Sequence, residues 1–338
     1  MSTDDRIILL AHGDGGRLTH ELVTQLFFKH LGNRTLEMLT DAAALTVGEG
    51  RIAVTTDSFV IDPPFFPGGD IGKLAVCGTI NDLAVSGARP RYLTAAFLIE
   101  EGLPLEDLER IVASMAQTCN EAGVQVVAGD TKVVQRGHLD KIFINTTGVG
   151  EIPPDVDLGY HRIAQGDVLL VNGTLGEHGM AVLAAREGFG LEDQVQSDCA
   201  ALHEITARLL EDLGEDVRLM RDLTRGGFAT SVKEIAVSAQ CDIWISEGDV
   251  PVSPNTRGAA EMLGVDPLYL ANEGKFLAIV SPGKAERALA ALKEHPLGRE
   301  ARIVGEVRSG QGNVYLKTLL GGTKYLDLLA GAPLPRIC

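Results

Sequence analysis

The chain has 338 residues, of which 45% are hydrophobic and 22% charged, and its formal net charge is −16 at pH 7. Because a single hydrophobic core stops growing at about 250–300 residues, we expect two domains. The acidic balance and the lack of basic runs argue against a nucleic-acid partner, since such binding depends on Lys and Arg to neutralise phosphates. A polyanionic ligand would need a divalent metal to help bind it.

The start of the chain is polar and acidic over residues 1–5 and does not have the pattern of a secretion signal. No run approaches the ~18 uninterrupted apolar residues of a membrane-spanning helix. We therefore predict a cytoplasmic protein with no membrane partner.

The first half of the chain alternates apolar runs with amphipathic stretches. Apolar residues recur at helical spacing from 105 to 115, behind Pro104, whose fixed φ suits the first turn of a helix. Strands are predicted at 51–56, 92–99, 124–128 and 141–149. This half is expected to mix helices and strands.

A proline pair at 153–154 interrupts the pattern, and a new apolar run follows Gly166. Strands are predicted at 168–171, 242–246, 276–281 and 301–307, and helices at 177–187, 199–212, 227–238, 255–263 and 283–293. The interleaving predicts an α/β (α+β) fold. We expect an N-terminal domain at 1–155, a C-terminal domain at 156–325 and a tail at 326–338.

The five cysteines form no CxxC pair and are odd in number, so neither disulfides nor a zinc cluster is expected. Four lie in apolar contexts and are interpreted as core residues: Cys77, Cys119, Cys199 and Cys241. Cys338 instead ends the chain, after prolines that favour an extended path. We predict a flexible tail, whose last eight residues could span about 26–29 Å and carry the thiol into a cleft.

Several apolar segments end in an aspartate. Such segments precede Asp57, Asp82, Asp130 and Asp222, and Asp41 is a fifth candidate. Sites are often built just past strand and helix ends, and clustered carboxylates suit Mg²⁺. A cap or turn is the alternative for any single aspartate, and the repetition is what favours a metal site.

Two of three glycine-rich segments could hold phosphate through backbone N–H groups. Residues 11–17 precede a helix-like stretch but lack the GxGxxG spacing, and residues 173–179 follow a strand. A structural turn explains either segment as well. Residues 68–74 lack both the first glycine and the Ser/Thr of a P-loop, so a Walker-type ATPase is not supported.

Two further loop motifs, 129–132 and 272–275, contain charged residues. Lys132 could neutralise a transferring phosphoryl group, and Glu273 could act as a base. A surface salt bridge is the alternative for each motif.

Taken in chain order, the motifs resemble one family. They are HGDGG at 12–16, TDS at 56–58, FFPGG at 65–69, NDLAVSG at 81–87, GDTKVV at 129–134, RDLTRGG at 221–227, NEGK at 272–275 and PRIC at 335–338. This set resembles the HypE family, the carbamoyl dehydratases of nickel–iron hydrogenase maturation. The terminal motif is the most specific, because the others also resemble aminoimidazole ribonucleotide synthetase, selenophosphate synthetase and thiamine-monophosphate kinase.

The resemblance implies a two-domain aminoimidazole ribonucleotide synthetase-like fold. Its N-terminal domain would pair into a barrel-like sheet across a homodimer, and its C-terminal domain would be an α/β sandwich. ATP and Mg²⁺ would be the cofactors. The implied ATP-binding residues are Gly13, Gly15, Gly16, Lys73, Asn81, Gly129, Asp130 and Thr131. The implied metal ligands are Asp41, Asp57, Asp82 and Asp222, and the implied catalytic residues are Cys338, Lys132 and Glu273.

The resemblance also implies partners. A HypF-type carbamoyltransferase would load Cys338, this protein would convert the carbamoyl group to a thiocyanate with ATP, and a HypC–HypD iron scaffold would receive the cyanide. Two other functions stay open. One is a superfamily kinase or synthetase acting on a free small molecule, which needs no terminal cysteine. The other is a metal scaffold, for which one thiol makes a poor site.

Overall fold

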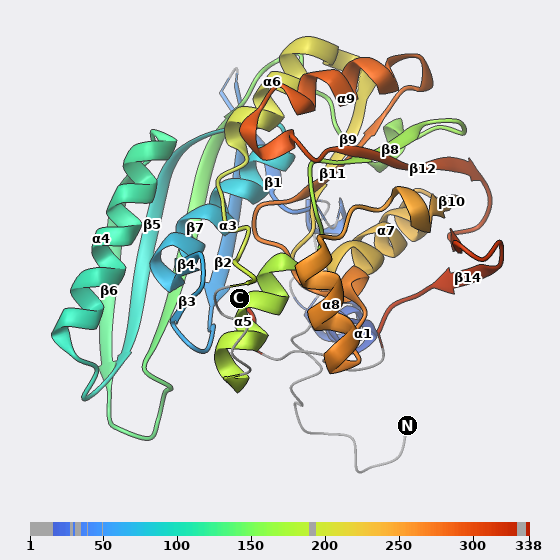
Figure 1. Ribbon diagram of the computed structural model, residues 1–338. Helices are drawn as coiled ribbons and strands as arrows, with labels where there is room; N and C mark the ends of the chain where they lie inside the picture. The colour runs from blue at the N-terminus through green and yellow to red at the C-terminus, as the bar shows by residue number, and fades with distance from the viewer. Residues whose placement is uncertain are drawn as a thin grey trace.

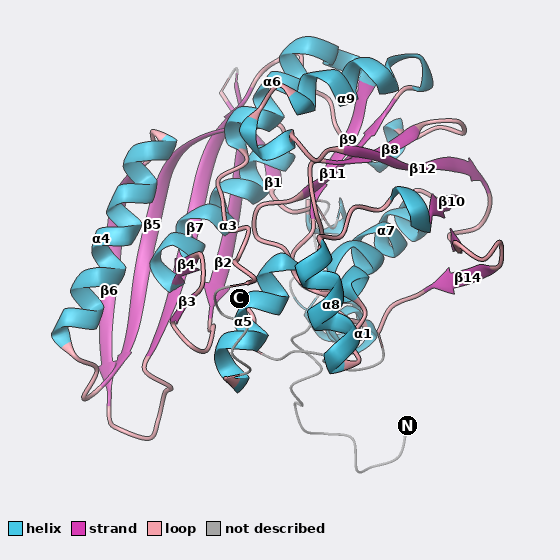
Figure 2. Ribbon diagram, in the orientation of Figure 1, coloured by secondary structure: helices cyan, strands magenta, loops and turns pink. Residues whose placement is uncertain are grey.

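The computed structural model describes residues 16–27, 30, 35–38, 40–48, 50–188, 194–329 and 336–338. Two sheets carry helices on their faces and meet along the middle of the molecule (Figures 1 and 2). The first is built from residues 43–152 and the second from residues 168–326. Within the described ranges, every helix is too short or too polar to span a membrane.

The first sheet has five strands in the order β1-β2-β7-β5-β6. They are β1 (Ala43–Val47), β2 (Gly50–Phe59), β7 (Ile142–Ile152), β5 (Arg89–Glu100) and β6 (Gln125–Val134). Neighbouring strands are antiparallel except for the parallel pair β5 and β6. Because β6 is exposed along almost its whole length, the sheet ends in an open edge rather than closing into a barrel within the described chain.

Two helices, α3 (Ile71–Val85) and α4 (Leu105–Ala122), cover one face of this sheet. The amphipathic α4 turns Ile111, Met115 and Cys119 to the core. In contrast, α3 is buried on nearly all sides, because it packs on β2, β7 and α4 and also contacts elements of the second half. This places α3 at the centre of the molecule (Figure 1).

The second sheet has seven strands in the order β14-β13-β10-β12-β8-β11-β9. They are β8 (Val168–Val171), β9 (Val217–Asp222), β10 (Cys241–Ser246), β11 (Phe276–Val280), β12 (Arg302–Ser309), β13 (Val314–Lys317) and β14 (Thr323–Leu326). The strand β11, next to the edge strand β9, is completely buried: Phe276 and Ala278 pack towards one core cluster, and Leu277 and Ile279 towards another. Such two-sided burial is expected of a sheet layered between helices.

Helices lie on both faces of the second sheet. The helices α6 (His203–Leu213) and α9 (Ala285–Lys293) share one core cluster with the sheet, and α7 (Gly227–Ser238) contributes Phe228 and Val232 to the other. Two further helices, α5 (Glu177–Glu187) and α8 (Pro254–Leu263), pack against each other below α7 in Figure 1. The short α1 (Arg17–Leu22) begins where the Arg17 N–H donates to the Leu329 carbonyl at 3.3 Å.

The predicted strands and helices match observed elements to within a few residues, and α4 extends further than predicted. The main omission is α3, which hydrophobic periodicity does not reveal because almost every face of this helix is buried. The strands β1, β9, β13 and β14 are likewise not predicted. Burial on all sides conceals α3, whereas the four strands are short, with four to six residues each, and three of them lie at sheet edges.

The segment that resembles an incomplete P-loop is a hairpin followed by a helix start. The strands β3 (Phe65–Phe66) and β4 (Gly69–Asp70) pair, and the Asp70 carboxylate caps α3 by accepting from the backbone N–H groups of Gly72 at 2.8 Å and Lys73 at 3.2 Å. The Lys73 ammonium donates to the Gly68 carbonyl at 3.1 Å. This capping accounts for the acidic residue at position 70.

A glycine at the crossing of α3 and α4 provides a test of this packing. A Cβ atom on Gly72 would overlap the carbonyl oxygen of Ile111. We expect Gly72→Ala to lower the free energy of unfolding by about 1–3 kcal/mol, because the two helices must separate. Gly258→Ala in α8 is the matched control: its Cβ would meet open space, so alanine should stabilise the helix by about 0.5–1 kcal/mol. Urea denaturation measures both, and a Gly72→Ala protein of parental stability would contradict this packing.

Candidate active site

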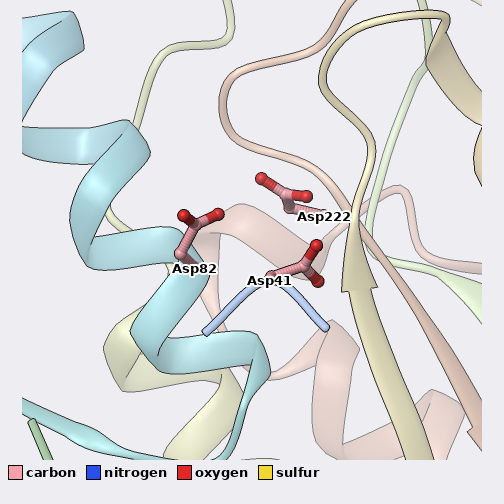
Figure 3. A group of neighbouring side chains, drawn as sticks. All are labelled: Asp41, Asp82 and Asp222. Carbon is pink, nitrogen blue, oxygen red and sulfur yellow. The ribbon is translucent and has the colours of Figure 1, made fainter. Parts of the chain in front are cut away.

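Three aspartates converge where the two sheets meet. One carboxylate oxygen from each of Asp41, Asp82 and Asp222 lies within 4.8 Å of the others (Figure 3). Asp82 comes from α3, Asp222 is the last residue of β9, and Asp41 lies just before β1. The site is therefore assembled from both halves of the chain.

The local positions of these aspartates correct part of the sequence interpretation. Asp222 does end a strand, but Asp57 lies inside β2, Asp82 inside α3 and Asp130 inside β6. The prediction that these three follow the ends of elements is wrong. On β2, Asp57 alternates with exposed Thr56 and Ser58 and so faces the same side as Thr55 and Phe59. On α3, the apolar run reflects burial of the whole helix, not its end.

Burial of like charges perturbs the site strongly. Burial raises the pKa of Asp82 well above its usual range, and the neighbouring carboxylates of Asp222, Asp57 and Asp41 raise it further. The pKa of Asp222 is raised well above its usual range in the same way, first by burial and then by Asp41. Such a cluster attracts a cation, because each carboxylate lacks the solvent that would otherwise stabilise its charge.

Hydrogen bonds and an ion pair hold the carboxylates in place. The Thr55 hydroxyl lies 2.6 Å from the Asp82 carboxylate and 3.0 Å from the Asp41 carbonyl, so it links two of the three aspartates. The Arg221 guanidinium pairs with Asp41 at 3.0 Å and with Glu234 on α7 at 3.0 Å. Arg221 thereby offsets the charge of Asp41 more directly than that of Asp82.

Glu273 lies on the loop before β11 and is also buried, at 2% exposure. Its Oε1 atom has no hydrogen-bond partner among the described residues. Burial raises the pKa of Glu273 well above its usual range, and Asp222 adds to the effect. A surface salt bridge, the alternative for motif 272–275, is therefore wrong for Glu273.

The loop that carries Glu273 is fixed by a residue the sequence interpretation does not single out. The Asp198 carboxylate accepts from the backbone N–H groups of Glu273 and Gly274, both at 3.1 Å, and from the Lys275 ammonium at 3.0 Å. Burial is the largest single influence and acts to raise the pKa of Asp198, but Lys275, His178 and the Glu273 N–H together outweigh it, so the pKa is lowered. Asp198 therefore stays charged and orients the loop.

The chain ends at this site. Cys338 packs against the core of the first half, and the Val60 N–H donates to its carbonyl oxygen at 3.0 Å. Burial raises the pKa of the Cys338 thiol to about 12; the Arg225 guanidinium lowers it, and Glu273, Asp57 and Asp222 raise it. The terminal thiol thus lies in the same electrostatic environment as the carboxylates, and it is neutral there.

The residues implied to bind ATP do not all gather at this point. Asn81 is buried, and its amide donates to the carbonyls of Ala200 at 3.0 Å and Glu273 at 3.1 Å, which joins α3 to the Glu273 loop. Lys73 lies in the first turn of α3, and Gly16 immediately precedes α1. Gly13 and Gly15 fall outside the described residues.

The motif at 129–132 lies apart from the carboxylates. Gly129, Asp130, Thr131 and Lys132 are on β6, three strands from β2 and hence about 14 Å away across the sheet. Lys132 and Asp130 form an exposed ion pair of 2.7 Å. Within a single chain, therefore, the motif at 129–132 forms the surface salt bridge that the sequence analysis gave as the alternative to a catalytic role.

Some residues near the carboxylates carried little or no signal in the sequence. Arg225 belongs to the motif at 221–227 but was assigned no role there. Its pKa is raised first by Cys338 and then, against burial, by Asp57 and Glu273. His178 on α5 is completely buried and contacts the tail. No spacing pattern reveals His178 or Asp198, because their partners lie far away in the chain.

Comparison with known proteins places the chain in a family. Residues 39–152 match the family model for the N-terminal domain of AIR synthase related proteins, and residues 164–317 match the model for the C-terminal domain. Carbamoyl dehydratase HypE of Escherichia coli K12 is 50% identical over 336 residues, covering 98% of this chain and 99% of that protein. The chain belongs to the HypE family.

Solved structures agree with this assignment. A crystal structure of hydrogenase maturation protein HypE in complex with ATP is 47% identical, covers 98% of this chain and 100% of its own, and superposes with a TM-score of 0.83. HypE in a HypE–HypF complex is 44% identical, covers 91% and 99%, and gives a TM-score of 0.86. The predicted two-domain fold and the predicted membership among carbamoyl dehydratases are both confirmed.

The carboxylate cluster predicts that neutralising one of its aspartates stabilises the metal-free protein. Asp222→Asn should raise the free energy of unfolding by about 1 kcal/mol in metal-free buffer, because it removes a buried like charge. We expect added Mg²⁺ to stabilise the parent protein but not Asp222→Asn. Thermal melting with EDTA and with added Mg²⁺ measures both effects.

The control for this test is Asp249→Asn, which changes an exposed aspartate and should alter neither value. A metal-free Asp222→Asn protein less stable than the parent, or one that Mg²⁺ still stabilises fully, would contradict a cation site at this cluster.

Proposed function

We propose that this protein uses ATP to dehydrate a carbamoyl group carried on its own Cys338, forming a thiocyanate that supplies cyanide to the iron of nickel–iron hydrogenase. The main observation in support of this proposal is the position of Cys338. Its thiol shares a buried environment with Asp57, Asp222 and Glu273, and no free small-molecule substrate is needed to explain that arrangement.

The chemistry explains the need for ATP. Conversion of S–C(=O)–NH₂ into S–C≡N breaks the carbon–oxygen bond, and hydroxide is a poor leaving group. If the carbamoyl oxygen attacks the γ-phosphorus, ADP leaves first, and the oxygen then leaves carbon as inorganic phosphate. The nitrogen loses both protons as the triple bond forms. The products are the thiocyanate, ADP and phosphate.

The residues present suit a magnesium nucleotide. Asp41, Asp82 and Asp222 offer only hard carboxylate oxygens, which is the donor set that Mg²⁺ prefers, and Asp57 lies beside them as a fourth candidate ligand. When bound there, Mg²⁺ would spread the charge of the phosphates. The ATP complex of the HypE relative supports ATP as the nucleotide.

Glu273 is the proposed base for the nitrogen protons. Its Oε1 is unpartnered among the described residues, so it can accept a proton without first breaking a hydrogen bond. Because burial raises the pKa of Glu273, its carboxylate is a stronger base than that of an ordinary glutamate. The Asp198 carboxylate holds the backbone of this residue and so aims its side chain.

Partners follow from the same scheme. A HypF-type protein supplies the carbamoyl group, as the HypE–HypF complex of a relative supports, and a HypC–HypD scaffold accepts the cyanide.

A homodimer is proposed through the first sheet. Three valines on its open edge strand are exposed: Val126 at 44%, Val127 at 56% and Val133 at 66%. Unpaired edges of this kind invite pairing with another chain.

The two alternative functions fit less well. A kinase or synthetase for a free small molecule does not account for a terminal cysteine beside the carboxylates, and the 50% identity to a carbamoyl dehydratase favours the dehydratase. A metal scaffold would rely on the Cys338 thiol as a soft ligand, but the surrounding donors are hard carboxylates.

The carrier and the base can be tested together. The protein is incubated with a HypF-type carbamoyltransferase, carbamoyl phosphate and ATP, and the C-terminal peptide is weighed by mass spectrometry. The parent should gain a carbamoyl mass and then lose water. Cys338→Ser should do neither while keeping its fold. Glu273→Gln should retain the carbamoyl adduct and lose water at least about 100-fold more slowly.

Glu101→Gln, at an exposed position, is the control and should behave as the parent. Normal thiocyanate formation by Cys338→Ser would refute the carrier role, and a parental dehydration rate in Glu273→Gln would remove that residue from the mechanism.

Lys132 is proposed to act from the second chain of the dimer, because its own chain holds it about 14 Å from β2. Lys132→Ala homodimers should accept the carbamoyl group but dehydrate it slowly. These homodimers are then mixed with Cys338→Ser homodimers and allowed to exchange subunits. In the resulting heterodimer the Lys132→Ala chain carries the carbamoyl group and its partner supplies an intact Lys132, so dehydration should be restored. No restoration in verified heterodimers would exclude action across the dimer.

A further inference from the structure

The docked tail is held from one side by α5. Two of its side chains, His178 and Arg186, reach the last three residues of the protein. Neither residue belongs to the carboxylate cluster, and the dehydration scheme gives neither a role. Both contact main-chain atoms of the tail, within two residues of the thiol that must be positioned.

The hydrogen bonds of His178 define its protonation state. Its Nε2 atom lies 2.7 Å from the Ile337 carbonyl oxygen, which can only accept, so Nε2 carries the hydrogen. Nδ1 lies 2.8 Å from the Ser197 hydroxyl and accepts from it when the ring is neutral. The Ser197 oxygen in turn accepts from the Cys199 N–H at 3.1 Å. Burial lowers the pKa of His178, which favours this neutral form.

Arg186 connects the tail to the segment beside it. Its guanidinium donates to the Arg336 carbonyl at 2.6 Å and to the Asp62 carbonyl at 2.8 and 3.0 Å. The tail also pairs with this segment directly, since the Asp62 N–H donates to the Arg336 carbonyl at 3.3 Å. The tail thus runs antiparallel to residues 60–62, joined to them by two backbone hydrogen bonds, and Arg186 binds carbonyls of both segments.

The side chain of Arg336 adds a contact away from α5. Its Nε donates to the Val60 carbonyl at 3.1 Å, and its guanidinium pairs with Asp140. These bonds do not depend on whether the chain after Arg336 turns towards the carboxylates or away from them. After Arg336, the His178 bond to Ile337 and the Val60 N–H bond to Cys338 hold the chain in the inward direction, and of these two only the His178 bond comes from a side chain.

We propose that His178 and Arg186 form a tail clamp: they are positioning residues that hold the loaded tail in register with the dehydration site and release it for exchange with partners. This inference rests on the proposed function. Because the clamp binds backbone carbonyls, it is indifferent to whether the sulfur carries hydrogen, carbamoyl or cyanide. A few hydrogen bonds are strong enough to favour docking and weak enough to allow departure.

Two amide variants separate the hydrogen bond from simple packing. In His178→Gln the amide nitrogen can occupy the place of Nε2 and donate to Ile337, whereas in His178→Asn the shorter amide reaches only the place of Nδ1. Loss of the donor leaves a buried carbonyl unsatisfied and should shift the tail towards the undocked state by about tenfold. His178→Gln should restore most of the docking.

Docking can be measured without the reaction. Endoproteinase Asp-N releases the C-terminal peptide 327–338, since Asp327 is the last aspartate, and its mass reports alkylation of Cys338 by iodoacetamide in the native protein. We expect His178→Asn to be alkylated about tenfold faster than the parent, and His178→Gln at close to the parental rate. His161→Asn, at an exposed histidine, is the control and should not change the rate.

The same variants are then followed through the reaction. His178→Asn should accept the carbamoyl group from the carbamoyltransferase at the parental rate, because that step uses the undocked tail, and should dehydrate it about tenfold more slowly. Arg186→Gln tests the second contact independently and should show the same pattern. A structural defect would instead slow both steps and lower the melting temperature of both His178 variants alike.

The outcomes distinguish the clamp from the proposed function. Unchanged alkylation in both His178→Asn and Arg186→Gln, or equal losses in His178→Asn and His178→Gln, would overturn the clamp. If the parent forms no thiocyanate although its Cys338 is protected and His178→Asn exposes it, the clamp is supported and the proposed reaction is refuted.

Discussion

The burial of several carboxylates where the two sheets meet is the constraint on which the rest of the structure depends. Asp82 on α3, Asp222 at the end of β9 and Asp41 before β1 are brought within one ligand shell of each other, which is unfavourable without positive charge. Arg221 supplies part of that charge, and a bound cation would supply the rest. The site is therefore a contact between domains as well as a candidate centre of reaction.

The position of α3 follows from that constraint. The helix supplies Asp82 to the site and Asn81 to the Glu273 loop, while its remaining faces pack on the first sheet and on α4. Consecutive residues of one helix thus face the carboxylate cluster and the loop of the proposed base. Small displacements of α3 would alter both, which is why dense packing around this helix is functionally relevant and not only stabilising.

Keeping the substrate on the protein itself changes what the site must do. A carbamoyl group on Cys338 is delivered at a high local concentration, so the site does not need a pocket that selects a free molecule. The requirement is reversible docking of the tail. Residues 336–338 are held by hydrogen bonds to the backbone of residues 60–62, by His178 and Arg186, and by the ion pair of Arg336 with Asp140. Such contacts can form and break without unfolding either sheet.

The sequence by itself determined much about this protein. Alternating periodicities defined α4, α7 and most strands, because each has one buried and one exposed face or a clear boundary. The ordered motifs and the terminal Cys338 defined the family, and the repeated aspartates indicated the hard-oxygen chemistry. These features are local or depend on the order of residues along the chain, and a sequence displays both.

The tertiary structure alone decided which of those residues meet. It brought Asp41, Asp82 and Asp222 together, left Lys132 and Asp130 as an exposed pair on β6, and revealed the support that Asp198, Arg225 and His178 give to the site. It also showed α3, whose periodicity is masked by burial on all sides. Contacts between residues more than a hundred positions apart depend on how two sheets pack, and no local pattern records that packing.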